Sequence, residues 1–157
     1  MLFYELIEAF DKENLKYALV GGYALALHGL VRATVDVDFV LTLTQKDFEL
    51  AEKTLLSLGL QSRLPIRGQD IIKMRKEYID KRNLIAWSFV DFSNPSRQVD
   101  ILITENLKDL DTERISIRGK KVTVATLKEL LRMKTASDRP QDLIDAQNIK
   151  AKLHEKK

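Results

Sequence analysis

The sequence contains no cysteine and no long apolar run. Without cysteine the protein cannot form disulfide bonds, use a thiolate nucleophile or hold zinc through sulfur ligands. No apolar stretch is long enough to cross a bilayer, and the first residues lack the charged-then-apolar order of a secretory signal. We therefore expect a cytoplasmic protein that does not contact a membrane.

Histidine is scarce as well, with only His28 and His154 in the chain. The two lie too far apart in sequence for a zinc motif, and His28 sits in an apolar run where a packed or capping role is expected. The chain also has no internal repeat, low-complexity tract or linker, so we expect one domain over residues 1–157. Its net charge of +3 suits a nucleotide or nucleic-acid partner without requiring one.

Hydrophobic periodicity and turn residues predict the order of the structural elements. Helices are expected at residues 2–14, 23–28, 47–57, 127–136 and 140–152, and strands at 17–20, 36–42, 84–90, 98–103, 115–117 and 122–124. Residues 69–81 form either a charged helix or a mobile excursion. Turn signals at 93–96 and 118–120 predict two hairpins, and Thr126 with Glu129 predicts a capping box. This order predicts an α/β (α+β) fold, a mixed sheet with flanking helices, ending in a helix pair at about 126–152.

Three aspartates stand out against the apolar strands that contain them. Asp36 and Asp38 alternate with Val37 and Phe39, so both carboxylates project from one face of the strand. Two like charges on one face repel, and a bound divalent cation removes that repulsion. Asp100 interrupts another apolar strand, and charged residues are seldom buried unless they are paired or bound to a metal. If the two strands are neighbours, the three carboxylates converge on a site suited to two-metal phosphoryl chemistry.

A glycine pair precedes these aspartates. Gly21 and Gly22 follow a buried strand, where glycine allows a tight turn and a close backbone approach to a ligand. The amides of the helix that follows would face an anion such as a nucleoside triphosphate. Arg32 and Thr34 lie in the connection before the aspartates, and Arg32 could donate charge-assisted hydrogen bonds to a phosphate.

Each of these features alone has an ordinary structural explanation. A glycine pair is usually only a turn, and an Asp-x-Asp pair is more often a solvated strand face. The three features in this order and spacing are much less common, and together they favour a metal and nucleotide site.

The combination resembles the signature of the nucleotidyltransferase superfamily. The run Val20-Gly21-Gly22, thirteen spacer residues and Asp36-Val37-Asp38-Phe39 match its two motifs. The strand 99–101 resembles the strand that carries the third carboxylate in that superfamily. The sequence of the glycine motif, together with Arg32 and Thr34, is similar to that of the minimal nucleotidyltransferases and of the abortive-infection (AbiEii-like) toxin-type nucleotidyltransferases. Residues 133–145 resemble the C-terminal helix pair of those proteins.

The resemblance implies a polymerase-beta-like fold and an enzyme that transfers a nucleoside monophosphate from an NTP. Asp36, Asp38 and Asp100 would be catalytic and would hold Mg²⁺ or Mn²⁺, with Asp100 helping to activate the acceptor hydroxyl. The nucleotide-binding residues would be Gly21, Gly22, Arg32, Thr34 and Lys134. For Lys134 the alternative is a surface lysine on a helix, and for Asp142 and Asp145 an ion-pair network between two helices is favoured.

Two departures from the family pattern matter. Glycine replaces the serine that often occupies the second motif position, which removes a hydroxyl that often contacts phosphate. The chain is also shorter than the larger toxin-type members, so we expect minimal acceptor recognition or a contribution from a partner chain.

Several functions remain open at this stage. The acceptor can be RNA (a transfer RNA end in toxin relatives), a partner protein or a small molecule, within a toxin–antitoxin or phage-defence module. An RNA acceptor predicts a basic surface beside the site, with Lys73, Arg75, Lys76, Lys81 and Arg82 as candidates. The alternative from another class is a catalytically idle module that binds a nucleotide, RNA or a protein.

Overall fold

The computed structural model describes residues 1–31, 33–137 and 139–155. Its helices are α1 (Leu2–Lys12), α2 (Gly21–Leu27), α3 (Gln45–Ser57), α4 (Gly68–Lys73), α5 (Arg75–Arg82), the 3₁₀ helix η1 (Leu107–Asp109), α6 (Leu127–Thr135) and α7 (Pro140–Glu155). Its strands are β1 (Ala18–Val20), β2 (Asp36–Val40), β3 (Gln61–Ser62), β4 (Ala86–Asp91), β5 (Asn94–Leu102), β6 (Thr112–Ile117) and β7 (Lys120–Ala125).

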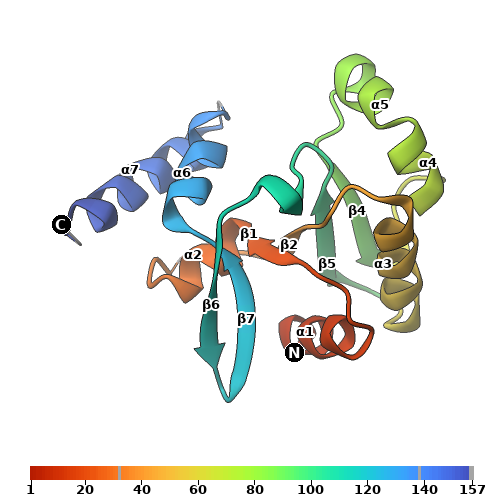
Figure 1. Ribbon diagram of the computed structural model, residues 1–157, viewed down its shortest axis with the longest axis horizontal. Helices are drawn as coiled ribbons and strands as arrows, with labels where there is room; N and C mark the ends of the chain where they lie inside the picture. The colour runs from red at the N-terminus through yellow and green to blue at the C-terminus, as the bar shows by residue number, and fades with distance from the viewer. Residues whose placement is uncertain (32, 138, 156–157) are drawn as a thin grey trace.

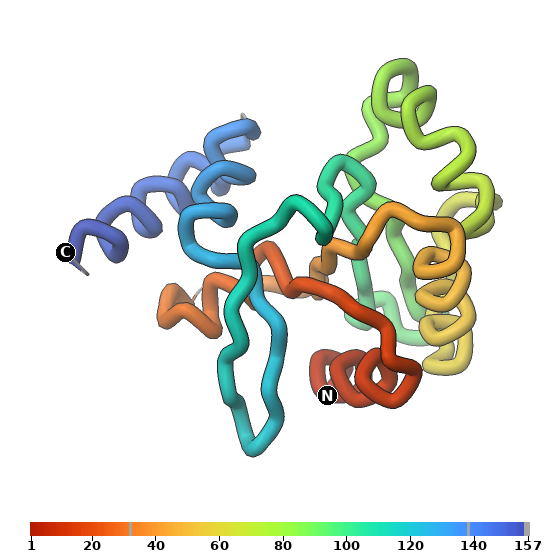
Figure 2. The backbone as a smooth tube through the Cα atoms, in the orientation of Figure 1, coloured from red at the N-terminus to blue at the C-terminus, as the bar shows by residue number. Residues whose placement is uncertain are grey.

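Within the described ranges the strands form one seven-stranded sheet in the order β3-β4-β5-β2-β1-β7-β6. The pairs β2–β5 and β1–β7 are parallel, and the other neighbours are antiparallel. The sheet is therefore mixed and flanked by helices, as the order of elements in the sequence predicts. The tube in Figure 2 shows that β2 and β5, which are far apart in sequence, run side by side at its centre.

The hydrophobic core lies between the sheet and the helices α1 and α3. Val37 and Phe39 of β2, Val99 and Ile101 of β5, and Trp87 of β4 are fully buried. Because alternate residues of a strand face opposite sides, the even-numbered residues of these strands form the other face. Phe10 of α1 packs edge-to-face on Phe39 of β2, with ring centroids 4.9 Å apart.

The helix pair α6–α7 and the helix pair α4–α5 lie at opposite sides of the sheet (Figure 1). No helix in the described part of the chain is both long and apolar enough to span a lipid bilayer.

Several boundaries differ from the sequence prediction, and three of them have a clear physical cause. Helix α2 begins at Gly21 rather than at residue 23, because the positive φ of Gly21 (+70°) lets the chain pass from strand to helix within one residue. The first hairpin turns at residues 92–93 rather than 93–96, because the Asp91 carboxylate accepts hydrogen bonds from the N–H and the hydroxyl of Ser93. Helix α7 continues to Glu155, with Lys152 and His154 in its last turn, where positive charge favours a helix end.

Two other expectations are resolved by the structure. Residues 68–82 are helical, but as two helices that meet at Met74. Thr126 caps α6 by accepting from the N–H of Glu129, as predicted, but the reciprocal half of the capping box is not formed. The Glu129 carboxylate instead accepts from the N–H of Asp111 and pairs with Arg132.

Candidate active site

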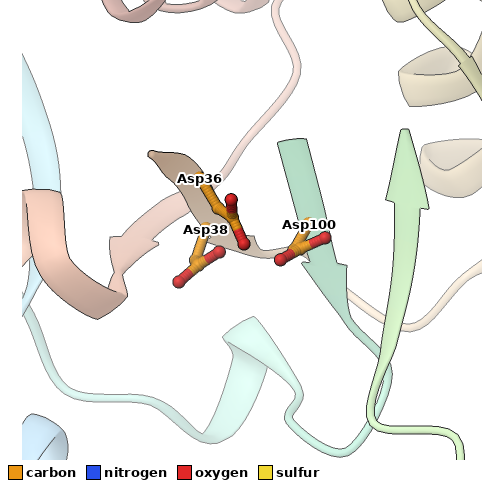
Figure 3. Close-up of side chains that lie close together, drawn as sticks. All are labelled: Asp36, Asp38 and Asp100. Carbon is orange, nitrogen blue, oxygen red and sulfur yellow. The ribbon is translucent and has the colours of Figure 1, made fainter. Parts of the chain in front are cut away.

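The three aspartates converge on the face of the sheet opposite the core. Asp36 and Asp38 come from β2, and Asp100 comes from β5. Asp38 is paired with Asp100 in the parallel register of these strands, so both side chains leave the sheet on the same side. Figure 3 shows the three carboxylates turned toward a common point.

The geometry of the three carboxylates fits a divalent cation. One oxygen from each of Asp36, Asp38 and Asp100 can be chosen so that all lie within 4.8 Å of one another. Asp38 Oδ1 is buried and has no hydrogen-bond partner among the described residues. A buried carboxylate oxygen without a donor is costly unless something else satisfies it. Magnesium prefers oxygen ligands of this kind, supplied by carboxylates and by the phosphates of a substrate.

Burial and mutual repulsion perturb the protonation of these groups. Burial, followed by the charges of Asp100 and Asp36, raises the pKa of Asp38 to about 8, against a smaller lowering by the charge of Lys134. Burial and the neighbouring Asp100 also raise the pKa of Asp36, while the charge of Arg63 lowers it. A cluster with too much negative charge for its surroundings is what a cation would stabilise.

Gly21 lies directly against this cluster. An ideal Cβ built on Gly21 would come within 2.1 Å of Asp38 Oδ2, and the φ of this residue is +70°. No L-residue with a side chain fits there without moving the carboxylate. The glycine therefore serves both the turn into α2 and the position of Asp38.

Gly22 and Thr34 form a second close contact. An ideal Cβ on Gly22 would lie 2.7 Å from both Cβ and Oγ1 of Thr34. Thr34 is half-buried, and its hydroxyl donates to the carbonyl of Asp36 at 3.3 Å. The Thr34 side chain thus occupies the space that a serine at position 22 would need. The hydroxyl missing from the glycine motif is present at nearly the same place, supplied by another segment.

Lys134 is buried rather than exposed on the polar face of its helix. Its Nζ contacts Asp142 Oδ1 at 3.0 Å and Asp145 Oδ2 at 3.1 Å, and both aspartates are only 2% exposed. These pairs join α6 to α7, which confirms the predicted ion-pair network between the two helices. Because its charge also lowers the pKa of Asp38, Lys134 belongs to the surroundings of the carboxylate cluster as well.

Asp142 is the centre of that network. It also accepts from the hydroxyl of Ser137 and from Arg139 Nε at 2.8 Å. Burial raises the pKa of Asp142, but hydrogen bonds from Ser137, Arg139 and Lys134 outweigh burial and lower it to about 2. Arg139 has a raised pKa, caused first by Asp142 and to a smaller extent by the charge of Asp38. The charges of Lys134 and Arg139 in this network therefore both interact with Asp38.

The sequence analysis also made predictions for Arg32 and His28. Arg32, a candidate phosphate ligand, lies outside the described residues. The packed or capping role expected for His28 is confirmed, because it is the C-cap residue of α2 and its Nε2 lies 2.9 Å from the Ala125 carbonyl oxygen.

The predicted basic surface (Lys73, Arg75, Lys76, Lys81 and Arg82) lies on α4 and α5. Within it, Arg75 donates from Nε to the carbonyl of Ile103 at 2.6 Å, a contact that anchors α5 to the end of β5. The positive charge that reaches Asp36 comes instead from Arg63, outside the predicted set.

Sequence reasoning also missed Ser88. This residue pairs with Asp100 across the β4–β5 ladder and therefore lies on the carboxylate face. The signal was available, because Ser88 is a polar residue between Trp87 and Phe89, which are both fully buried. Arg63 follows a two-residue strand and has no comparable signal.

The sequence model of the nucleotidyl transferase AbiEii toxin, from type IV toxin–antitoxin systems, matches residues 2–152. The chain belongs to the AbiEii nucleotidyltransferase family. No relative among curated proteins matches its sequence.

Solved structures of three other proteins share the fold of this AbiEii family member. The antibiotic-resistance factor ANT(2'')-Ia is 13% identical with a TM-score of 0.66, over 97% of this chain and 82% of that one. The lincosamide antibiotic adenylyltransferase LnuA is 12% identical with a TM-score of 0.65, over 95% and 94%. TM1012 from Thermotoga maritima is 12% identical with a TM-score of 0.60, over 98% and 91%. The expected polymerase-beta-like nucleotidyltransferase fold is confirmed.

Proposed function

We propose that this enzyme is a metal-dependent nucleotidyltransferase whose reaction centre is the cluster of Asp36, Asp38 and Asp100. The observation that supports it most is the orphaned Asp38 Oδ1 within a converging carboxylate set on an otherwise regular sheet face. The proposal treats residues 1–157 as one nucleotidyltransferase domain with a C-terminal helix pair. A cytoplasmic location belongs to the same proposal, because NTPs and magnesium are abundant there.

Magnesium, or manganese in its place, would be held by the three aspartates and would neutralise charge on the triphosphate and on the developing transition state. The triphosphate would lie on the Gly21 and Gly22 side, because the backbone there approaches Asp38 without an intervening side chain. Thr34 would offer its hydroxyl, and Lys134 would add positive charge.

The reaction then needs one deprotonation and one displacement. Asp100 accepts the proton of the acceptor hydroxyl, whose oxygen forms a bond to the α-phosphorus of the NTP. The bond from that phosphorus to the bridging oxygen of the β-phosphate breaks, and pyrophosphate leaves. This assigns a proton-accepting role to the carboxylate that is nearest to β4 in the sheet.

The acceptor is RNA, a protein or a small molecule in this proposal, with a role as the toxin of a type IV toxin–antitoxin or phage-defence module. Support for the toxin role comes from the family description, whereas the complex of ANT(2'')-Ia with adenylyl-2''-tobramycin illustrates a small-molecule acceptor on the same fold.

The test is transfer of label from each of the four α-labelled NTPs to acceptors in a cell lysate, with magnesium. We expect label on one acceptor class with wild type and none with Asp38→Asn, while Asp47→Asn, a half-buried aspartate at the start of α3, behaves as wild type. Label transfer that is equal in wild type and Asp38→Asn refutes the assignment of the site. Nucleotide binding without any transfer favours the idle binding module.

A further inference from the structure

A second polar row continues across the sheet beyond Asp100, on the side away from Gly21. The N–H of Arg63, just after β3, donates to the Ser88 carbonyl of β4 at 2.9 Å. Ser88 is paired with Asp100, and Asp100 is paired with Asp38. Arg63, Ser88, Asp100 and Asp38 therefore follow one another across four adjacent strand positions on the same face of the sheet.

The backbone of Arg63 is fixed by its neighbours. Ser62 faces the core, where its hydroxyl accepts from Nε1 of the fully buried Trp87 at 3.0 Å and donates to the carbonyl of Leu64 at 2.7 Å. Together with the bond to Ser88, these contacts hold both sides of residue 63. A long side chain that starts from a fixed backbone loses less freedom when it binds a ligand.

The guanidinium of Arg63 is not engaged by any described protein group, in contrast to those of five other arginines. Within the described part of the chain it forms no ion pair or hydrogen bond, and its side chain is exposed. Carboxylate or carbonyl oxygens of the protein are instead bound by Arg67, Arg75, Arg97, Arg132 and Arg139. Arg63 stands opposite Ser88, because the neighbouring Ser62 is paired with Phe89 in the antiparallel register of β3 and β4, so the side chain of Arg63 leaves the sheet on the carboxylate face. The hydroxyl of Ser88, half-buried between Arg63 and Asp100, likewise has no hydrogen-bond partner among the described residues.

We propose that Arg63 and Ser88 form an acceptor subsite that selects an acceptor with a phosphate group close to its reacting hydroxyl. The inference rests on the proposed function, because the nucleotide on the Gly21 side leaves the Ser88 side of Asp100 for the acceptor. Strands lie about 4.8 Å apart, so the backbone of Arg63 is roughly two strand spacings from that of Asp100. A guanidinium reaching back over Ser88 would bind a phosphate in bidentate fashion while the hydroxyl lies at Asp100.

The same arrangement disfavours a polycationic acceptor. An aminoglycoside such as the tobramycin bound by ANT(2'')-Ia would bring ammonium groups toward Arg63. Like charges at such a site weaken binding, so the subsite discriminates between phosphorylated and cationic acceptors on one fold.

The test uses adenosine 5′-monophosphate (AMP) and adenosine, which differ by the 5′-phosphate and share their 2′- and 3′-hydroxyls. Binding is measured by calorimetry with magnesium and a non-hydrolysable ATP analogue present, for wild type, Arg63→Gln, Arg63→Lys and the control Arg114→Gln, an exposed arginine of the edge strand β6. We expect wild type to bind AMP roughly 10-fold more tightly than adenosine, the size of one charge-assisted contact. Arg63→Gln should lose this preference, Arg63→Lys should keep part of it, and Arg114→Gln should match wild type.

Two further probes separate the sources of the phosphate. A preference for ApA over AMP identifies the phosphodiester of an RNA end, and the reverse preference identifies a phosphorylated small molecule. Equal affinities for AMP and adenosine in wild type, an unchanged preference in Arg63→Gln, or tighter binding of tobramycin than of AMP would overturn the proposal. If the ATP analogue itself does not bind, the proposed function fails, and the comparison of AMP with adenosine in wild type and Arg63→Gln without nucleotide still decides whether Arg63 binds phosphate.

Discussion

Asp38 lies directly opposite Asp100 in the parallel register of β2 and β5. Neighbouring parallel strands rarely place two carboxylates side by side without a positive partner between them, because like charges at that distance repel. The pairing of these two residues is therefore the feature that an account of this protein has to explain, and a bound cation explains it.

Removing one of these charges should stabilise the metal-free protein. The pKa of Asp38 is raised from its ordinary value of 3.8 to about 8, so the folded state binds the proton more tightly than the unfolded chain. The stabilisation that comes from protonated Asp38 is fully present below pH 4 and is lost as the pH rises to about 8. In EDTA at pH 8 we expect Asp38→Asn to unfold at a higher temperature than wild type. Its free energy of unfolding should be larger by on the order of a few kcal/mol.

Thermal unfolding followed by circular dichroism between pH 4 and pH 9 provides the measurement. The difference between the two proteins should vanish near pH 4, where both side chains are uncharged. A difference that does not depend on pH would mean that the asparagine acts through packing instead.

Gly21→Ala should displace Asp38, since the added methyl group would meet Oδ2 at 2.1 Å. Gly119→Ala is a matched control, because Gly119 also has a positive φ (+78°) but has nothing within 4 Å of its ideal Cβ. Backbone strain alone costs about 1–2 kcal/mol in both variants. We expect Gly119→Ala to keep its transferase activity and Gly21→Ala to lose at least roughly 10-fold in metal affinity. Equal losses of metal affinity in the two variants would show that strain, not contact with Asp38, is responsible.

The hydroxyl beside the glycine motif should be movable from residue 34 to residue 22 only when both residues are changed together. Gly22→Ser alone places a side chain 2.7 Å from Thr34 Oγ1, so it should lower both the unfolding temperature and NTP affinity. The double variant Gly22→Ser/Thr34→Gly removes the collision and returns a hydroxyl near the same position, so it should recover NTP affinity. Thr34→Val, which keeps the shape but not the hydroxyl, should fold normally and bind NTP less tightly. Failure of the double variant to exceed Gly22→Ser would argue against a hydroxyl role.

Loss of the Lys134 charge should destabilise the junction of α6 and α7. Lys134→Met leaves Asp142 and Asp145 buried without their common partner, and breaking a buried pair of this kind costs about 3–5 kcal/mol. Lys128→Met, at an exposed position of the same helix, should cost little.

Chemical denaturation of both lysine variants provides the comparison. Adding Asp142→Asn and Asp145→Asn to Lys134→Met should restore much of the lost stability, because no buried unpaired charge remains. A triple variant that is stable and fully active would remove Lys134 from the nucleotide site.

The fold and the aspartates could be predicted because local patterns carry them. Alternation in the strand around Asp36 and the apolar neighbours of Asp100 determine which face each side chain occupies. Thr126 is likewise predictable as an N-cap, because threonine caps a helix by accepting a hydrogen bond from a backbone N–H in its first turn. These signals depend on residues adjacent in sequence.

The rest depends on segments that meet only in the folded chain. The register that places Ser88 beside Asp100, and the approach of Thr34 to Gly22, follow from strand pairing over long separations. Glu129 does not complete its capping box because Asp111 and Arg132 are available to it in the folded protein. The position of Arg63 opposite Ser88 has the same origin.

The most direct test of the account is NTP binding with and without magnesium, in wild type and in Asp38→Asn. Wild type should bind an NTP tightly only when magnesium is present, because the metal joins the triphosphate to the three carboxylates. Asp38→Asn should bind weakly in both conditions. Binding that is the same with and without magnesium, and the same in both proteins, would contradict a metal site at Asp36, Asp38 and Asp100.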